Sequence, residues 1–305
     1  MSTQPAILCA VDLSWRSNAA FSHAVALAKS RDARLDLVFA VPTRRPYGWR
    51  VRERAAQLAE LRRQASAAAV DMTVSVQHGD PADVILAHAG SPHPGPADVI
   101  VLGAPRRRGI ERLWHPSVAQ AVVRRADRPT LIVPGASFSD GHIGVPFRRV
   151  LCAIDSSPAS MVAIAEALRI VRTDAGTMHL LHVVDVAHPA VPRVALEFDA
   201  TDHTRELTEH AWRRFRLLVP RSEALRGRVQ LQVTVGLVVD EIIRSANDSK
   251  ADLVVLGVAD GGWLSRLVSA TAIRAVRRLE CPVLGVPAVR KRAAATAAQA
   301  ARIAA

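Results

Sequence analysis

The sequence predicts two consecutive α/β domains of the doubly wound class, each built around a five-stranded parallel sheet. Three observations support this prediction. The chain has 305 residues, a length that suggests about two domains. Short runs of valine, isoleucine and leucine alternate with longer helical patterns, which is typical of parallel strands buried on both faces. Finally, three strings of residues recur in the same order further along the chain, which indicates that one domain has been duplicated.

The duplication is visible in strings that occupy the same places in the two halves. ILCAVD (7–12) returns as VLCAID (150–155), ADVIVLG (97–103) as ADLVVLG (251–257), and RPTLIVP (128–134) as CPVLGVP (281–287). We therefore expect a first domain over residues 1–139 and a second over 146–289. Gly135–Pro146, which contains glycine, serine, aspartate and proline, is expected to link them, and an alanine-rich tail follows over 290–305.

The elements of the two copies follow one another in the same order. In the first copy we expect strands at 7–11, 35–41, 72–76, 98–103 and 130–134, separated by helices at about 17–30, 50–69, from 81 onward and near 117–127. In the second copy we expect strands at 148–154, 178–184, 229–235, 252–257 and 283–286, separated by helices from 158, near 201–218, from 240 and near 270–279. Asp80 is suited to cap the third helix, with Pro81 in its first turn. Right-handed crossovers between the parallel strands complete a doubly wound fold in each copy.

The last strand of each copy is expected at an edge of its sheet. Thr130–Val133 and Val283–Val286 are short and apolar, and each precedes a proline, which lacks the N–H needed to extend the pairing. An open apolar edge invites a partner, and the other copy offers a matching one at high effective concentration. We therefore predict that the copies pack as a pseudo-two-fold pair through these strands, as in a homodimer, and that two such chains can dimerise further.

Composition excludes several classes of protein. The net charge is +12, and 37 of the 40 basic residues are arginine, but these are spread over both halves. Aromatic residues make up only 4%, too few for a stacking surface, so nucleic-acid binding is disfavoured. Three cysteines without CxxC spacing predict neither a disulfide framework nor a zinc site. The chain has no apolar run of about 18 residues and no basic leader, so we expect a cytoplasmic protein without membrane contact.

Taken together, the strings resemble the universal stress protein family in its tandem two-domain form, over nearly all of residues 5–288. The resemblance rests on Asp12 and Asp155 after the first strands, Phe39–Val41 and His182–Val184 at the ends of the second, Gly79 and Gly236 before the third helices, and the fourth and fifth strands quoted above. It implies a strand order of 3-2-1-4-5 and a regulatory or sensor role in the stress response. Because some members bind ATP, it also implies an adenine-nucleotide site at the carboxyl ends of the strands.

The implied nucleotide site uses matching positions in the two domains. In the first domain these are Asp12, Val41, Gly103 and Ser117, and in the second Asp155, Val184, Gly257, Gly261, Gly262 and Thr271. An aspartate after the first strand can accept hydrogen bonds from a ribose, and a glycine after the fourth lets backbone approach a phosphate. The alternative for Asp12 and Asp155 is that they cap the following helices, and both alternatives stay open.

The phosphate loops depart from the family pattern of the ATP-binding members, Gly-x2-Gly-x9-Gly-(Ser/Thr). In the first copy Arg106 and Pro116 replace the inner glycines, and Pro116 also removes a backbone donor. In the second copy Asp260 and Ala270 replace them, although two glycines follow Asp260 directly. We therefore expect ATP in the second domain in preference to the first. The degenerate loops leave a nucleotide-free protein-interaction module of the same fold as the alternative function.

No constellation of catalytic residues accompanies this site in the sequence. There is no Gly-x-Ser-x-Gly elbow, metal-binding cluster or evident general base, so at most slow ATP hydrolysis is expected. Cys9 and Cys152 occupy matching positions in the first strands, where buried thiols with a structural role are expected. His179 and His182 alternate with leucines on a strand and are expected to be hydrogen-bonded structural residues. The expected partners are therefore an adenine nucleotide and other proteins.

Overall fold

A computed structural model describes residues 4–13, 17–41, 51–91, 95–104, 118–134, 145–185, 200–218, 225, 227–258 and 278–288. The first half contains β1 (Ala6–Val11), α1 (Asn18–Ser30), β2 (Arg34–Val41), α2 (Val51–Ala67), β3 (Met72–His78), α3 (Pro81–Gly90), β4 (Val99–Ala104), α4 (Val118–Arg125) and β5 (Thr130–Pro134). The second half contains β6 (Arg149–Ile154), α5 (Pro158–Thr173), β7 (Thr177–Asp185), α6 (Ala200–Phe215) with a 3₁₀ turn (Arg216–Leu218), β8 (Val229–Gly236), α7 (Val238–Asp248), β9 (Leu253–Val258) and β10 (Val283–Pro287). The apolar runs located these strands well: the inner strands are buried over most of their length, whereas the outermost strands β3 and β8 are partly exposed.

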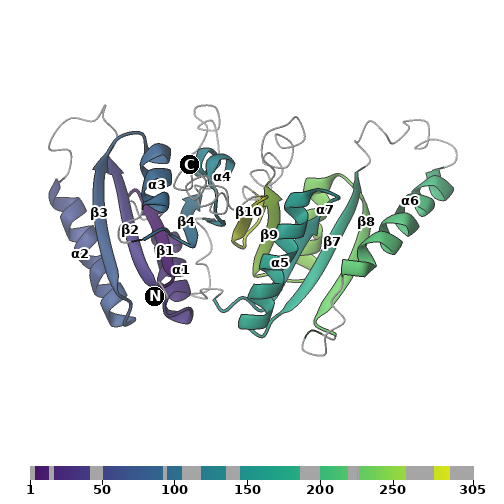
Figure 1. Cartoon of the computed structure of the whole chain (residues 1–305), viewed down its shortest axis with the longest axis horizontal. Helices are drawn as coiled ribbons and strands as arrows, with labels where there is room; N and C mark the ends of the chain where they lie inside the picture. The colour runs from purple at the N-terminus through teal and green to yellow at the C-terminus, as the bar shows by residue number, and fades with distance from the viewer. Residues whose placement is uncertain are drawn as a thin grey trace, which may run out of the picture.

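The strands form one continuous ten-stranded sheet, in the order β3-β2-β1-β4-β5-β10-β9-β6-β7-β8. Within each half the neighbouring strands are parallel. The first half therefore has the expected order 3-2-1-4-5, and the second half repeats that order from the opposite edge. Figure 1 shows the two halves side by side, with the short strand β10 near the middle of the molecule. The α/β fold class is confirmed.

The two halves are joined where β5 and β10 run antiparallel to each other. The paired residues are Thr130 with Gly285, Leu131 with Leu284, and Ile132 with Val283. Every residue of both strands is buried. The predicted pairing of the two copies through their last strands is therefore confirmed, and each apolar edge is covered by the other.

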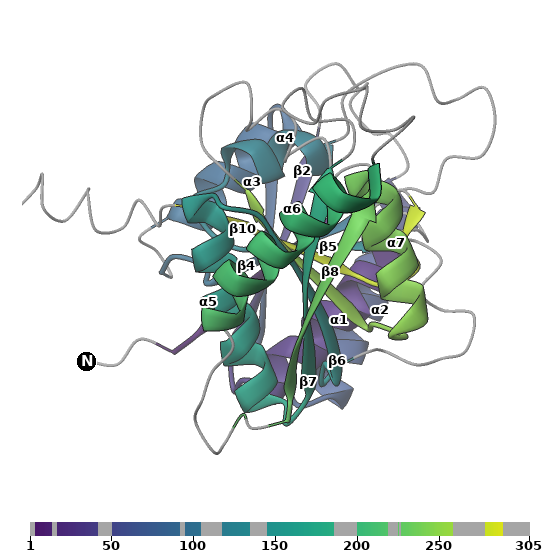
Figure 2. The same cartoon turned by 90° about the vertical axis from the view of Figure 1, so that its right-hand side faces the viewer.

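The apolar core extends across this junction on both faces of the sheet. One cluster of buried side chains includes residues of α1, α2, α5 and α6, and a second cluster includes residues of α3, α4 and α7. Alternate residues of a strand enter different clusters, as with Ile7 and Leu8 of β1, because successive side chains point to opposite faces. In Figure 2, α5 and α7 lie on opposite sides of β7 and β8. Both clusters contain residues of both halves, so each cluster is shared by the two domains.

The aspartate of the repeated Ala-Asp string has the same structural role in each half. The Asp98 carboxylate accepts a hydrogen bond from the backbone N–H of Ala6 at 3.0 Å. The Asp252 carboxylate accepts from the N–H groups of Arg148 and Arg149 at 3.0 and 2.9 Å. Burial raises the pKa of Asp252, although these N–H groups oppose the shift. The two aspartates therefore tie the start of the fourth strand of each half to the start of its first strand.

The starts of α3 and α7 depend on local chemistry to different degrees. As expected, Asp80 caps α3, accepting from the N–H groups of Ala82 and Asp83 at 3.0 and 3.2 Å. Helix α7 begins at Val238, so the expectation that it starts at Asp240 was wrong. Asp240 lies inside the first turn, where a negative charge is favourable near the amino end of the helix dipole. No helix in the described part of the chain is long and apolar enough to cross a membrane.

Candidate functional site

The carboxyl ends of β6 and β9 meet at one edge of the second half of the sheet. Ala153 pairs with Leu256 in this parallel ladder, so Asp155 and Gly257 lie at the same edge. Asp155 follows β6, leads into α5 and is exposed. These are the first and fourth strands of the domain, between which the strand order reverses. Open α/β sheets bind ligands in the crevice outside such a point, which makes this edge the candidate site.

The carboxylate of Asp155 is held in a fixed position by two donors. Its Oδ1 accepts from the backbone N–H of Ser157 at 2.9 Å and from the hydroxyl of Ser160 at 2.6 Å. Its own N–H donates to Oγ of Ser160 at 2.9 Å. Oδ2 has no hydrogen-bond partner among the described residues. Partial burial raises the pKa of Asp155, but the hydrogen bonds from Ser157 and Ser160 outweigh it, so the net pKa lies below its ordinary value.

Helix α5 is capped by Ser157 and not by Asp155, so the capping alternative for Asp155 does not hold. Ser157 is the N-cap of α5, and its hydroxyl oxygen accepts from the N–H of Ser160 at 3.3 Å. Asp155 instead closes the turn that precedes the helix, through the N–H of Ser157. The carboxylate therefore has a structural role through one oxygen, while the other oxygen is available to a ligand.

His182 lies beside this turn, at the end of β7. Its Nδ1 is 3.0 Å from the carbonyl oxygen of Ile154, and because a carbonyl only accepts, Nδ1 must carry the proton. Burial lowers the pKa of His182, so the ring is neutral near pH 7 and its Nε2 is an acceptor. The ring also packs against Phe215, with centroids 4.3 Å apart. The expectation of a hydrogen-bonded structural histidine is confirmed for His182.

Gly257 is required by the packing of α5 on β9. A Cβ at this position would lie 2.6 Å from the carbonyl carbon of Ala159 and 2.8 Å from the nitrogen of Ser160. Backbone atoms cannot yield as a long side chain can, so only glycine fits. Gly257, the last residue but one of β9, thus lets a helix approach the sheet, and its expected role beside a phosphate stays a prediction.

The other expected site residues that the structure describes also lie at carboxyl ends of strands. Asp12 follows β1 and is exposed, while Val41 is the last residue of β2, Val184 is the last but one of β7, and both are half-buried. The carbonyl oxygen of Val41 accepts from the N–H of Gly79 at 3.0 Å, which joins the ends of β2 and β3. Gly103 pairs with Val133 in the ladder between β4 and β5. The residues expected in the phosphate loops, Arg106, Pro116, Ser117, Asp260, Gly261, Gly262, Ala270 and Thr271, lie outside the described residues.

Sequence reasoning missed a second concave region, between the two halves. It is a cavity of about 740 Å³, to which Arg31 and Arg169 contribute. The two arginines are far apart in the sequence and meet only because β5 pairs with β10. The sequence contained one indication that this position differs between the copies: Arg31 of the first copy has no basic counterpart in the second.

Two doubly wound domains joined through their fifth strands, with a polar edge at the strand-order reversal, define a tandem α/β protein. A family model described as the universal stress protein family matches residues 5–134 and again 146–287. The chain therefore belongs to the universal stress protein family, in a tandem form, and the resemblance seen in the sequence is confirmed. Membership supports a role in the stress response.

Individual relatives agree with this assignment. A universal stress protein of Methanocaldococcus jannaschii is 25% identical over 148 residues, which are 48% of this chain and 85% of the relative. The crystal structure of a universal stress protein from Archaeoglobus fulgidus matches 92% of this chain and 96% of its own, with a TM-score of 0.64 and 18% identity. A functionally unknown protein from Pseudomonas aeruginosa matches 98% of both chains, with a TM-score of 0.63 and 16% identity. At these identities the two structures show the fold alone.

Proposed function

We propose that this chain is a cytoplasmic regulatory protein of the stress response that binds an adenine nucleotide, ATP, in its second domain. The observation that supports this most directly is the geometry of Asp155. One carboxylate oxygen is fixed by Ser157 and Ser160, and the other has no partner among the described residues. The group is exposed at the edge where such sheets bind ligands. A ribose hydroxyl can donate to it without any rearrangement of the protein.

The charge state of Asp155 suits this role. Because its pKa is lowered, the carboxylate is ionised at neutral pH and acts only as an acceptor. Hydrogen bonds to an ionised group contribute about 1.5–3 kcal/mol each, so losing one weakens binding by about tenfold or more. The neutral ring of His182 lies next to the same edge and adds no positive charge to it.

The test is calorimetric titration of the full chain with ATP and Mg²⁺. We expect heat from the wild type and at least about tenfold weaker binding for Asp155→Asn, which keeps the shape of the side chain. The matched control is Asp12→Asn in the first domain, where Pro116 removes a phosphate-loop donor and no loss is expected. An absence of heat and of thermal shift at millimolar ATP removes the proposal, and so does an Asp155→Asn variant that binds as tightly as the wild type.

A second candidate function is a nucleotide-free module that acts through protein contacts. It is favoured by the packing of Gly257, which explains that glycine without a phosphate. Val76, Val235 and Leu237, on or next to the outermost strands β3 and β8, are also 55%, 37% and 49% exposed, so apolar surface is available to a partner or a second copy. ATP that co-purifies with the freshly isolated protein would exclude this alternative.

A further inference from the structure

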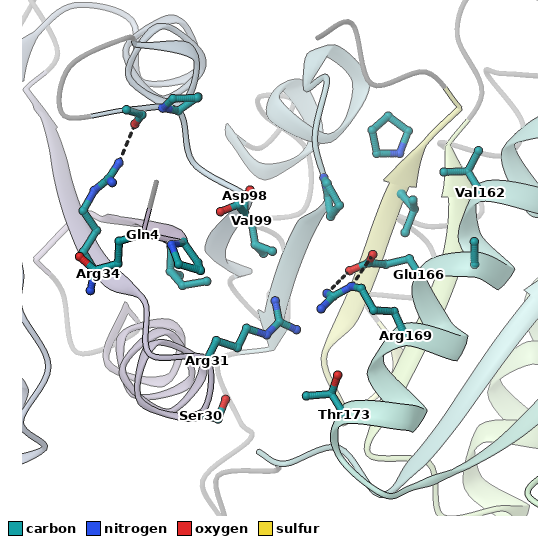
Figure 3. A pocket seen from close by; sticks show the side chains of 18 residues that line it. Gln4, Ser30, Arg31, Arg34, Asp98, Val99, Val162, Glu166, Arg169 and Thr173 are labelled. Atoms are coloured by element: carbon teal, nitrogen blue, oxygen red, sulfur yellow. Dashed lines mark hydrogen bonds and ion pairs between the residues drawn. The ribbon is translucent and has the colours of Figure 1, made fainter. Parts of the chain in front are cut away.

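The cavity between the two halves is lined by both domains. From the first half come the starts of β1 and β4 and the residues that end α1, and from the second come α5 and the end of β10 (Figure 3). Its volume of about 740 Å³ is in the range of pockets that hold small organic molecules. Asp155 is not among the residues that line this cavity.

Arg31 is the charged group in this cavity that lacks a partner. It follows the last residue of α1, and Figure 3 shows its side chain reaching across the cavity toward Arg169. Its guanidinium makes no hydrogen bond or ion pair with any residue in the described ranges. Burial lowers the pKa of Arg31, and repulsion from Arg169 lowers it further. Arg31 is partly buried on the wall of the cavity, and its guanidinium can donate to an anion that enters there.

The other two arginines of the cavity differ from Arg31 because each is already paired. Arg34 donates to a carboxylate oxygen of Asp36 at 3.2 Å and to the carbonyl oxygen of Gly95 at 2.7 Å. Arg169 makes two parallel hydrogen bonds to Glu166, at 3.0 and 2.5 Å. The paired groups set the shape of the cavity and leave Arg31 as the free donor.

The carboxylates near Arg31 do not neutralise it, although all three attract it. Glu166 is held by Arg169, Asp98 accepts from the N–H of Ala6, and Asp174 accepts from the N–H of Phe147 at 2.7 Å. None of them forms an ion pair with Arg31 in the described part of the chain. The lining residues include three arginines and two carboxylates, Asp98 and Glu166, and two further carboxylates lie just outside them: Asp36, which is paired with Arg34, and Asp174.

We propose that this cavity binds a small organic phosphate or carboxylate. The charged group of this anion is held by Arg31 and faces Arg169 from the other domain. The planar guanidinium of arginine matches either group with two parallel hydrogen bonds. Val162, Ala165 and Val286 supply an apolar wall for the body of the ligand. The hydroxyl of Thr173 lies at the same cavity and can donate to a further polar atom, whereas the hydroxyl of Ser30 already donates to the carbonyl oxygen of Leu27 at 3.0 Å.

The site exists once in the chain because the repeat is not symmetric here. Helices α1 and α5 are equivalent, and each is followed by a residue with positive φ, Asp32 at 48° and Ala175 at 52°. Alignment at these residues places Arg31 opposite Asp174. A dimer of identical domains would carry two arginines or two aspartates at this position, so the single cationic site requires the tandem chain.

The experiment is calorimetric titration of the full chain with phenyl phosphate, inorganic phosphate, benzoate and benzyl alcohol. We expect phenyl phosphate or benzoate to bind, benzyl alcohol not to bind, and Arg31→Gln to weaken the anion by about tenfold or more. The matched control is Arg172→Gln, which removes the same charge from an exposed position of α5 that does not line the cavity, and it should bind as the wild type does.

Protein stability gives a second, independent measurement. In buffer without phosphate, Arg31→Gln should melt close to the wild-type temperature, because the loss of repulsion from Arg169 is offset by the loss of attraction to Glu166, Asp174 and Asp98. Three outcomes overturn the proposal: no binding of either organic anion at millimolar concentration, equal affinity for Arg31→Gln and the wild type, or equal losses in both arginine variants. Loss of phenyl phosphate binding in Asp155→Asn with full binding in Arg31→Gln would also overturn it, because the anion would then lie at the strand edge.

Discussion

Replacing Gly257 with alanine tests how closely α5 approaches the sheet. The added methyl carbon would lie 2.6 Å from the carbonyl carbon of Ala159 and 2.8 Å from both its oxygen and the nitrogen of Ser160. These are backbone atoms, so the whole first turn of α5 must move. Overpacking of this kind typically destabilises a protein by about 1–3 kcal/mol. For a unit of this size, each 1 kcal/mol lowers the melting temperature by about 2–4 °C.

The assay is chemical unfolding of Gly257→Ala beside Gly90→Ala as a matched control. Gly90 is the last residue of α3, and no atom lies within 4 Å of a Cβ added there, so that variant should be unchanged or slightly more stable. Because the first turn of α5 also carries Ser160, the Gly257 variant should weaken the hydrogen bond that fixes Asp155. If Gly257→Ala stays within about 0.5 kcal/mol of the wild type, the close approach is not as described.

Two further predictions concern acid stability and assembly. The pKa of Asp155 is lowered in the folded state, so its contribution to stability is present above its ordinary pKa of 3.8 and is lost as pH falls through the lower folded value. Melting curves between roughly pH 2 and 5 should therefore fall less steeply for Asp155→Asn than for the wild type, and identical slopes would contradict the assignment. Residues 1–139 expressed alone leave β5 without β10 and should dimerise with increasing concentration in analytical ultracentrifugation. A half that stays strictly monomeric and as stable as the full chain would show that the junction is dispensable.

Most of the fold could be predicted because its signals are local. The apolar runs locate the strands, and Asp80 marks the start of α3 through its own side chain. The start of α7 was missed because Leu237, its N-cap, makes no side-chain hydrogen bond and so leaves no residue-type signal. The junction was predictable because each domain ends in a short apolar edge strand that invites a partner.

The candidate sites were predictable only in part, because their properties depend on contacts between distant segments. The sequence places Asp155 after a strand but does not show that Ser160 and Ser157 occupy only one of its oxygens. It shows a glycine at 257 but not the helix that lies against it. In the sequence Arg31 cannot be distinguished from a solvated arginine, because only the packing of the second domain against the first brings Arg169 near it.

The position of β10 has a consequence for how the chain forms during synthesis. It is the last described strand in the sequence, yet it lies in the middle of the sheet, between β5 and β9. On the ribosome, β5 is complete early but stays open while all the intervening elements emerge. An open apolar strand can pair wrongly with a neighbouring nascent chain during that interval. The short length of β5 and the proline at residue 134 limit such pairing. The insertion of β10 then ends the exposure of β5 and closes both half-sheets in one step.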